Sequence, residues 1–133
     1  MADENDMLDE DLGLDDEGRR IILVHRLAKP VQVIGKRSGK EGEVLHEEQE
    51  LRFREPSASD VIQNGVPSKL VFEEGGYRVD LDEVKMGGMM SALLVSDALP
   101  PLRRAMLARL PADEWIAIAY GLARFFMPAQ PTA

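Results

Sequence analysis

A short stretch of this chain, residues 51–60, separates a half with the pattern of strands from a half with the pattern of helices. Residues 51–54 alternate apolar with basic side chains, which is the period of a half-buried strand. Pro56 cannot donate a ladder hydrogen bond and disfavours helical backbone in the residue before it, so the strand ends there. Ser57 can then cap a helix in which Asp60 meets free N–H groups. The sequence therefore predicts an α+β fold, in which a small antiparallel sheet from the N-terminal half packs against three to four C-terminal helices.

Two long strands are predicted before this junction. The first covers residues 20–29, is interrupted by Pro30 and resumes at residues 31–34, and the second covers residues 44–54. The intervening residues 35–43 combine glycines with bases, which could suggest a phosphate-binding loop. Their spacing matches no such motif and no helix follows directly, so we interpret them as a hairpin tip.

The half after the junction is predicted to contain four helices and one extra hairpin. Prolines, an Asn-Gly pair and acidic capping residues mark the boundaries. The helices are expected at residues 57–64, at 82–94, at 100–109, and from Pro111 until Pro128 ends the last one. The extra hairpin, residues 66–80, pairs residues 69–73 with 77–80 about a Glu-Gly-Gly turn.

One of these helices contains two adjacent glycines in its interior, Gly87 and Gly88. Each costs on the order of 1 kcal/mol against alanine in a helix. Close packing against a neighbouring element would offset that cost, and otherwise the helix would break at this point.

The acidity of the chain is concentrated at its N-terminus. Residues 1–18 contain nine of the 24 acids and no base, and the remaining 15 acids nearly balance the 16 bases. We therefore predict a disordered acidic tail at residues 1–18, one domain at 19–128 and a loose C-terminus at 129–133. The simplest interpretation of the tail is a solvated terminus. The alternative is that its apolar residues fold against a partner. These residues are Met7, Leu8, Leu12 and Leu14.

The composition favours a globular protein without a membrane or nucleic-acid partner. No apolar run approaches the length of a membrane span, and the acidic N-terminus does not resemble a targeting segment. The near-neutral body offers no excess of bases to neutralise phosphates. The chain has no cysteine, which is compatible with the cytoplasm.

Nothing in the sequence resembles a catalytic, cofactor or metal site. The two histidines, His25 and His46, are far apart in the sequence, and a metal site needs three or four convergent ligands. Ser57, Ser59 and Asp60 match no hydrolase motif and are better explained by helix capping. We expect no cofactor, no bound metal and no enzymatic activity.

Apolar helical surfaces are the remaining candidates for function. Methionines cluster in the helical half and can adapt to varied apolar partners, although each could equally be a core residue. The last helix has apolar residues on two faces, of which one can pack on the sheet and the other can bind a helix of another protein or a second copy. The predicted partner-binding residues are Met86, Met89, Met90, Leu93, Trp115, Ile116, Tyr120, Phe125 and Phe126.

The order of several short motifs resembles the phage tail assembly chaperone family. The strand ending in Arg54-Glu55-Pro56 is followed by a small hydroxyl residue and Asp60, and Leu27-Ala28-Lys29-Pro30 is similar to the family's opening strand. Leu99-Pro100-Pro101 precedes a helix, and Phe125-Phe126 is like the aromatic pair that often ends these domains. The resemblance covers residues 23–127 in coarse pattern, and the hairpin at 66–80 departs from it.

This resemblance implies a function in building phage tails. Such chaperones coat the helical tape-measure protein, keep it soluble, leave when tail-tube subunits polymerise, and are absent from the finished particle. It implies the bacterial host cytoplasm as location, the tape-measure protein as partner, and possible contacts with tail-tube subunits or a second copy. Two alternatives remain open, a structural neck or tail-completion subunit and a small regulatory protein whose acidic tail mimics nucleic acid.

Overall fold

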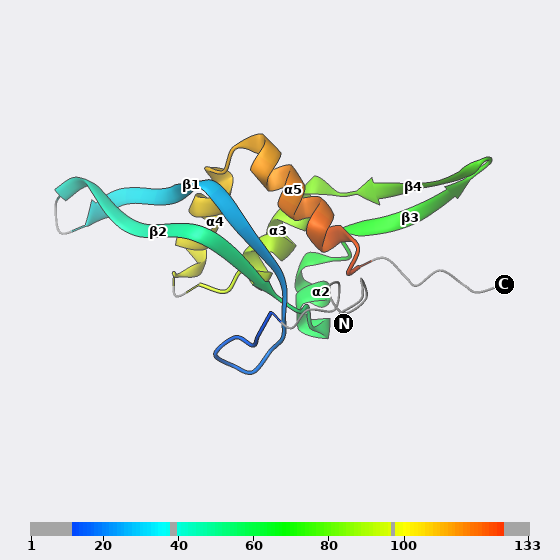
Figure 1. The fold of residues 1–133 in the computed structure, drawn as a ribbon, viewed down its shortest axis with the longest axis horizontal. Helices are drawn as coiled ribbons and strands as arrows, with labels where there is room; N and C mark the ends of the chain where they lie inside the picture. The colour runs from blue at the N-terminus through cyan, green and yellow to red at the C-terminus, as the bar shows by residue number, and fades with distance from the viewer. Residues whose placement is uncertain (1–11, 38–39, 97, 127–133) are drawn as a thin grey trace, which may run out of the picture.

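The computed structural model describes residues 12–37, 40–96 and 98–126, which form two β-hairpins around a group of helices (Figure 1). The hairpins extend from opposite ends of the helical body. This arrangement confirms the predicted α+β fold, with the strands divided between two separate two-stranded sheets. The elements are β1 (Ile21–Arg37), β2 (Lys40–Arg54), α2 (Ala58–Asn64), β3 (Ser68–Glu73), β4 (Gly76–Leu81), α3 (Glu83–Leu93), α4 (Pro100–Ala108) and α5 (Ala112–Ala123).

Strands β1 and β2 form one long antiparallel hairpin. Their register shifts between Arg26, which is opposite Glu50, and Val31, which is opposite Glu48. Three more residues of β1 than of β2 lie within that interval, so Pro30 falls in a bulge where its missing N–H breaks no ladder. The expected interruption at Pro30 is therefore a local irregularity within a continuous strand.

The tip of this hairpin is shorter than predicted. The strands pair as far as Arg37 and Lys40, whereas a loop was expected over residues 35–43. Glycine lowers strand propensity but does not prevent pairing once a register is set by the neighbouring residues.

The core lies between the β1–β2 sheet and helices α3, α4 and α5. Helices α3 and α5 each contribute four buried residues. Helix α5 crosses β1 closely, because a Cβ added at Gly121 would lie 3.1 Å from the Leu23 side chain. The buried apolar residues include Ile22, Leu27, Val31, Leu51, Phe53, Met86, Met89, Met90, Leu93, Met106, Leu107, Ile118, Ala119 and Leu122.

The strand-to-helix junction is built as the sequence predicts. Ser57 caps α2 and forms a reciprocal capping box with Asp60. Arg54 reaches over the cap, and its guanidinium donates to both carboxylate oxygens of Asp60 at 2.8 and 3.0 Å. It also donates to the backbone oxygens of Glu55 and Ala92 at 3.0 Å each. One arginine therefore joins β2, α2 and the end of α3.

This buried pair makes stability depend on pH in the acid range. Hydrogen bonds from Arg54, opposed by burial and assisted by Ser57, lower the pKa of Asp60 from 3.8 to about 2. Because the folded pKa lies below the unfolded one, the stabilisation is complete above about pH 4 and is lost as the pH falls towards 2. Between about pH 5 and pH 2 the wild type should lose about 2 kcal/mol more unfolding free energy than Asp60→Asn. Urea titrations at both pH values measure this, and equal losses would contradict it.

Strands β3 and β4 confirm the predicted extra hairpin. They pair from Ser68 opposite Leu81 to Glu73 opposite Gly76, and the turn between them places Gly75 at φ +89°. The base of the hairpin is attached to α5, where the Ser68 hydroxyl donates to the Ala123 carbonyl at 2.7 Å. The rest of the hairpin projects from the body (Figure 1).

The glycine pair in α3 is accommodated without a break in the helix. A Cβ at Gly88 would lie 2.7 Å from Oδ1 of Asn64, so a larger residue there would displace the Asn64 side chain that packs between α2 and α3. A Cβ at Gly87 would meet nothing within 4 Å. The expectation of close packing is therefore correct for Gly88 and wrong for Gly87.

The N-terminal boundary of the ordered domain differs from the prediction. Residues 12–18 were expected in the disordered tail, but Leu14 bridges to Arg20 and the Asp15 carboxylate accepts the backbone N–H groups of Glu17 and Arg19. The prediction of disorder for residues 1–11 lies outside the described residues, as does the loose end at 129–133.

The last helix ends earlier than Pro128 would require. It ends at Ala123, because the N–H groups of Phe125 and Phe126 bond to carbonyls three residues back and tighten the final turn. Pro128 itself lies outside the described residues.

Candidate protein-binding surface

The four predicted partner-binding residues of α3 lie inside the protein. The side chains of Met86, Met89, Met90 and Leu93 have no exposed surface. They fill the space between the sheet and the other helices, where the unbranched thioether of methionine adapts to irregular gaps. Their assignment to an exposed binding surface is therefore wrong for this structure, and the core interpretation of the methionines is correct.

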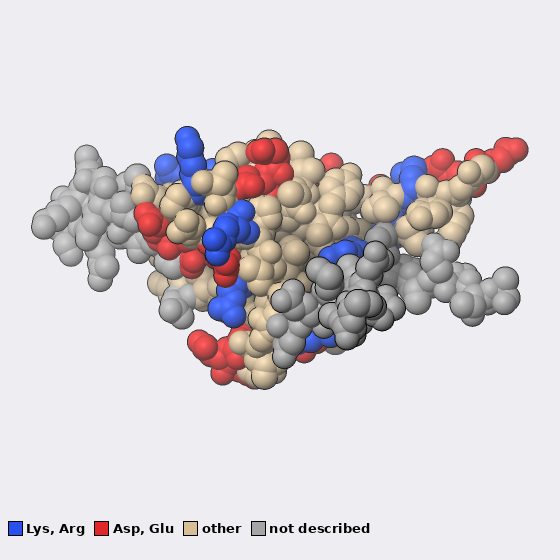
Figure 2. All heavy atoms as spheres, in the orientation of Figure 1, with Lys and Arg blue, Asp and Glu red and all other residues tan. Residues whose placement is uncertain are grey.

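The outer face of α5 carries the exposed apolar residues that the sequence predicts. Ile116 is 49% exposed and Tyr120 is 56% exposed, and they lie one helical turn apart. Asp113 and Glu114 precede them and Arg124 follows, so the helix between has no charge. Figure 2 shows this uncharged band over α5 between acidic and basic atoms. We call Ile116 and Tyr120 the α5 strip.

The remaining aromatic residues of the prediction are divided between surface and core. Trp115 and Phe126 are half-buried and pack against the core cluster. Phe125 is 37% exposed, and the Arg124 guanidinium carbon lies 5.6 Å from the centre of its ring. Trp115 and Phe126 therefore support the position of α5, whereas Phe125 extends its exposed apolar surface.

An apolar groove opens beside Trp115, between α3 and α4. Its volume is about 270 Å³. Val84 is almost fully exposed at its edge, and Gly87 leaves its floor open because no side chain fills that position. Glu83 and Arg104 place one charge of each sign on its lining, which is otherwise formed by Gly88, Leu107, Ala108 and Trp115. The sequence analysis missed this groove, although the absence of a side chain at Gly87 was a signal that could have indicated it.

The start of α5 is held against the bulge in β1. The Glu114 carboxylate lies 3.1 Å from His25 Nε2, and its other oxygen accepts the Ala28 N–H at 3.3 Å. A cavity of about 520 Å³ adjoins this contact and is lined by residues 28–32 and the α4–α5 connection. These contacts orient α5, so that the α5 strip faces away from the sheet.

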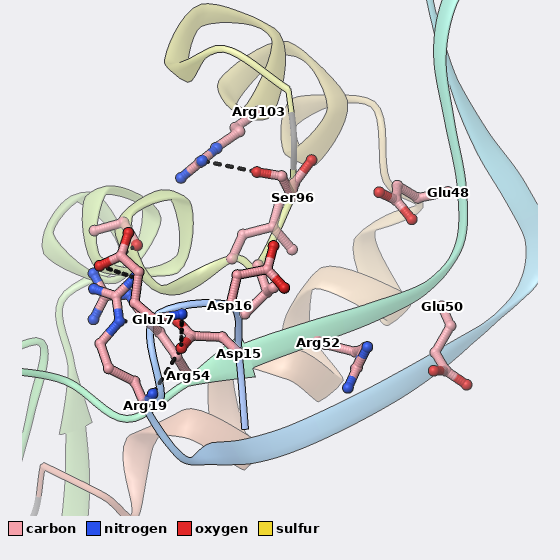
Figure 3. A pocket seen from close by; sticks show the side chains of 13 residues that line it. Asp15, Asp16, Glu17, Arg19, Glu48, Glu50, Arg52, Arg54, Ser96 and Arg103 are labelled. Carbon is pink, nitrogen blue, oxygen red and sulfur yellow. Dashed lines mark hydrogen bonds and ion pairs between the residues drawn. The ribbon is translucent and has the colours of Figure 1, made fainter. Parts of the chain in front are cut away.

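A more polar cavity of about 470 Å³ lies beside the C-terminal half of β2 (Figure 3). The turn at residues 15–19 forms one wall, the C-terminal end of β2 another, and the segment after α3 a third. Arg103 donates to the Ser96 and Ala98 carbonyls at 2.9 Å and closes that third wall. Asp16, Glu48, Glu50 and Arg52 also line the cavity.

The charges around this cavity mainly hold the turn in place. Burial would raise the pKa of Asp15, but hydrogen bonds from the backbone and side chain of Arg19 lower it. The Arg19 Nε lies 2.9 Å from this carboxylate, and its Nη2 lies 3.2 Å from Glu17. Acidic and basic groups thus neutralise one another here, and Figure 2 shows the same mixture of signs over much of the visible face.

Within the described ranges, no group of three or more His, Asp or Glu side chains is placed to hold a metal ion. His25 pairs with Glu114 as described, and His46 lies on β2 opposite Val33. None of the helices described here reaches the length and hydropathy needed to cross a bilayer.

No protein-family model, curated protein or solved structure matches this chain.

Proposed function

We propose that this chain is a tail assembly chaperone of a phage or prophage, which binds the tape-measure protein and keeps it soluble. The observation that supports the proposal best is the α5 strip, where two large apolar side chains are about half exposed on an uncharged helix face. Large apolar residues exposed together mark protein-binding sites more often than scattered single residues do. The partner is named by the family resemblance.

The chemistry of the α5 strip suits a helical partner. A tape-measure protein forms long helices whose apolar stripes are uncovered until tail-tube subunits enclose them. Ile116 and Tyr120 have the i, i+4 spacing that packs against such a stripe. The groove beside Trp115 offers a second apolar surface to the same partner.

The release step requires modest affinity. Only a few large side chains contribute, and the flanking charges at Asp113 and Arg124 stay solvated, so the interface is small and reversible. The proposal assigns no catalysis, cofactor or metal to the chain. It places the protein in the host cytoplasm during assembly and outside the mature virion.

Co-expression with the large helical protein encoded nearby tests this function. The tape-measure protein alone should collect in the pellet, and with this chain it should be soluble and co-purify at a defined ratio. An equally insoluble partner, or recovery of this chain in purified virions by mass spectrometry, would contradict the proposal. The second result would instead identify a structural subunit of the neck or tail.

A further inference from the structure

The β3–β4 hairpin exposes a pair of aromatic side chains on one face. Phe72 is 65% exposed and Tyr77 is 60% exposed, and their ring centres lie 6.3 Å apart. They are directly opposite each other, and the next pair on the same face is Leu70 with Val79. Two strands alone are marginal in water, and three or more are needed for independent stability.

The backbone of this hairpin has a free edge on β3. Within the described residues, β3 pairs with β4 and with no other strand. Glu73 and Gly76 flank the two-residue turn and therefore bond to each other, and hydrogen-bonded pairs then alternate along the ladder. By this alternation the N–H and C=O groups of Leu70 and Phe72 point away from β4. Such an edge can pair with another strand.

The residues of β3 are complementary to β3 itself. If two copies pair antiparallel about a two-fold axis at Val71, Leu70 of each copy is opposite Phe72 of the other. Lys69 of each copy is then opposite Glu73 of the other, which gives two pairs of opposite charge. Cross-strand pairs of opposite charge and of apolar side chains stabilise a sheet. Because each copy uses the same surface in such an isologous contact, the product is a closed dimer and not a longer assembly.

The β4 edge is less suited to the same contact. If two copies paired instead through β4, about a two-fold axis at Val79, Arg78 of each copy would be opposite Asp80 of the other. Arg78 is already paired within the hairpin, with Glu73 and, at 3.8 Å, with Asp80. Lys69, in contrast, makes no ion pair with any described residue, so it is available to a second copy.

We propose that two copies of this chain dimerise through the free edges of β3, in the register centred on Val71. The product is a four-stranded sheet that joins two helical bodies. Its apolar face runs through both copies, and each Phe72 gains Leu70 of the second copy as a neighbour. This inference does not depend on the proposed chaperone function, because it uses other residues and a different partner.

Two proline substitutions on opposite edges test it. Leu70→Pro and Val79→Pro replace residues that face each other across the hairpin, and both remove an outward N–H, so their cost within the hairpin is matched. Sedimentation equilibrium of the full chain should give a dimer for the wild type and for Val79→Pro. For Leu70→Pro it should give a dimer affinity at least about ten-fold lower than that of the wild type. A monomeric wild type, or dissociation by Val79→Pro but not by Leu70→Pro, would overturn the proposal.

Exchanging the charges of Lys69 and Glu73 provides an independent test of the dimer that does not alter the backbone. Lys69→Glu and Glu73→Lys should each weaken the dimer, because each places two pairs of like charge in contact. The double variant restores both pairs between copies but leaves the intrachain neighbours, Asp80 and Arg78, mismatched. Recovery of the dimer in the double variant is therefore specific to contact between copies. Failure to recover would place the contact elsewhere and overturn the register.

Discussion

Replacing Arg54 with methionine is expected to lower the free energy of unfolding by about 3–5 kcal/mol, because it leaves a buried carboxylate without its counter-ion. The side chains of Arg54 and Asp60 are only 10% and 9% exposed. Asp60 would keep its bonds from Ser57 but lose both bonds from the guanidinium. The contact between β2 and the end of α3 at the Ala92 carbonyl would be lost as well. Urea denaturation at neutral pH measures the change.

The neighbouring Arg52 supplies the matched control for this substitution. It lies on the same strand but is exposed, so Arg52→Met should change the unfolding free energy by no more than about 0.5 kcal/mol. Adding Asp60→Asn to Arg54→Met should recover part of the lost unfolding free energy, because the buried carboxylate without a counter-ion is then removed. Equal effects of Arg54→Met and Arg52→Met would show that the pair does not hold the junction together.

Replacing Ile116 or Tyr120 with aspartate is expected to weaken binding to the tape-measure protein about thirty-fold each. This factor corresponds to about 2 kcal/mol, the loss typical of a central interface residue. The unfolding free energy should change by no more than about 0.5 kcal/mol, because both side chains already contact water. Binding can be measured by titration with a soluble tape-measure fragment.

Two further variants separate the α5 strip from its surroundings. Ala105 is exposed on α4 and belongs neither to the α5 strip nor to the lining of the groove, so Ala105→Asp should leave affinity nearly unchanged. Gly87→Leu adds a side chain beside the groove at Trp115, at a position where nothing lies within 4 Å of the added Cβ. Weaker binding by Gly87→Leu would show that the partner also enters the groove. Equal loss from Ala105→Asp and Ile116→Asp would mean that an added charge impairs binding wherever it is placed on the helices.

Much of the fold could be predicted because local signals and the tertiary structure agree. Ser57, Asp60 and Asp82 are short capping residues, and each caps the helix that its position indicates. Pro100 begins α4 for a related reason, since the missing N–H of proline is unneeded in the first turn. The turn at Gly75 likewise identifies the β3–β4 hairpin.

The candidate site was harder to predict, because exposure depends on which helix packs against which. The spacing of Met86, Met89 and Met90 is compatible with either a core or a surface stripe, and only the position of α3 under the sheet decides between them. Periodicity indicated a second apolar face on α5, and Ile116 and Tyr120 are exposed there, but Ala123, which the same periodicity placed on that face, is buried. The groove at Gly87 also depends on how α4 and the start of α5 pack beside α3, which the glycine alone does not specify.

The most direct test of the central claim is photo-crosslinking from the α5 strip during co-expression with the tape-measure protein. A photoreactive phenylalanine analogue would be placed at position 116 in one variant and at position 105, which is exposed on α4, in another. The account predicts that position 116 couples this chain to the tape-measure protein, and that position 105 does so far less. No coupling from position 116 while the two proteins co-purify, or equal coupling from both positions, would contradict a partner-binding role for this face of α5.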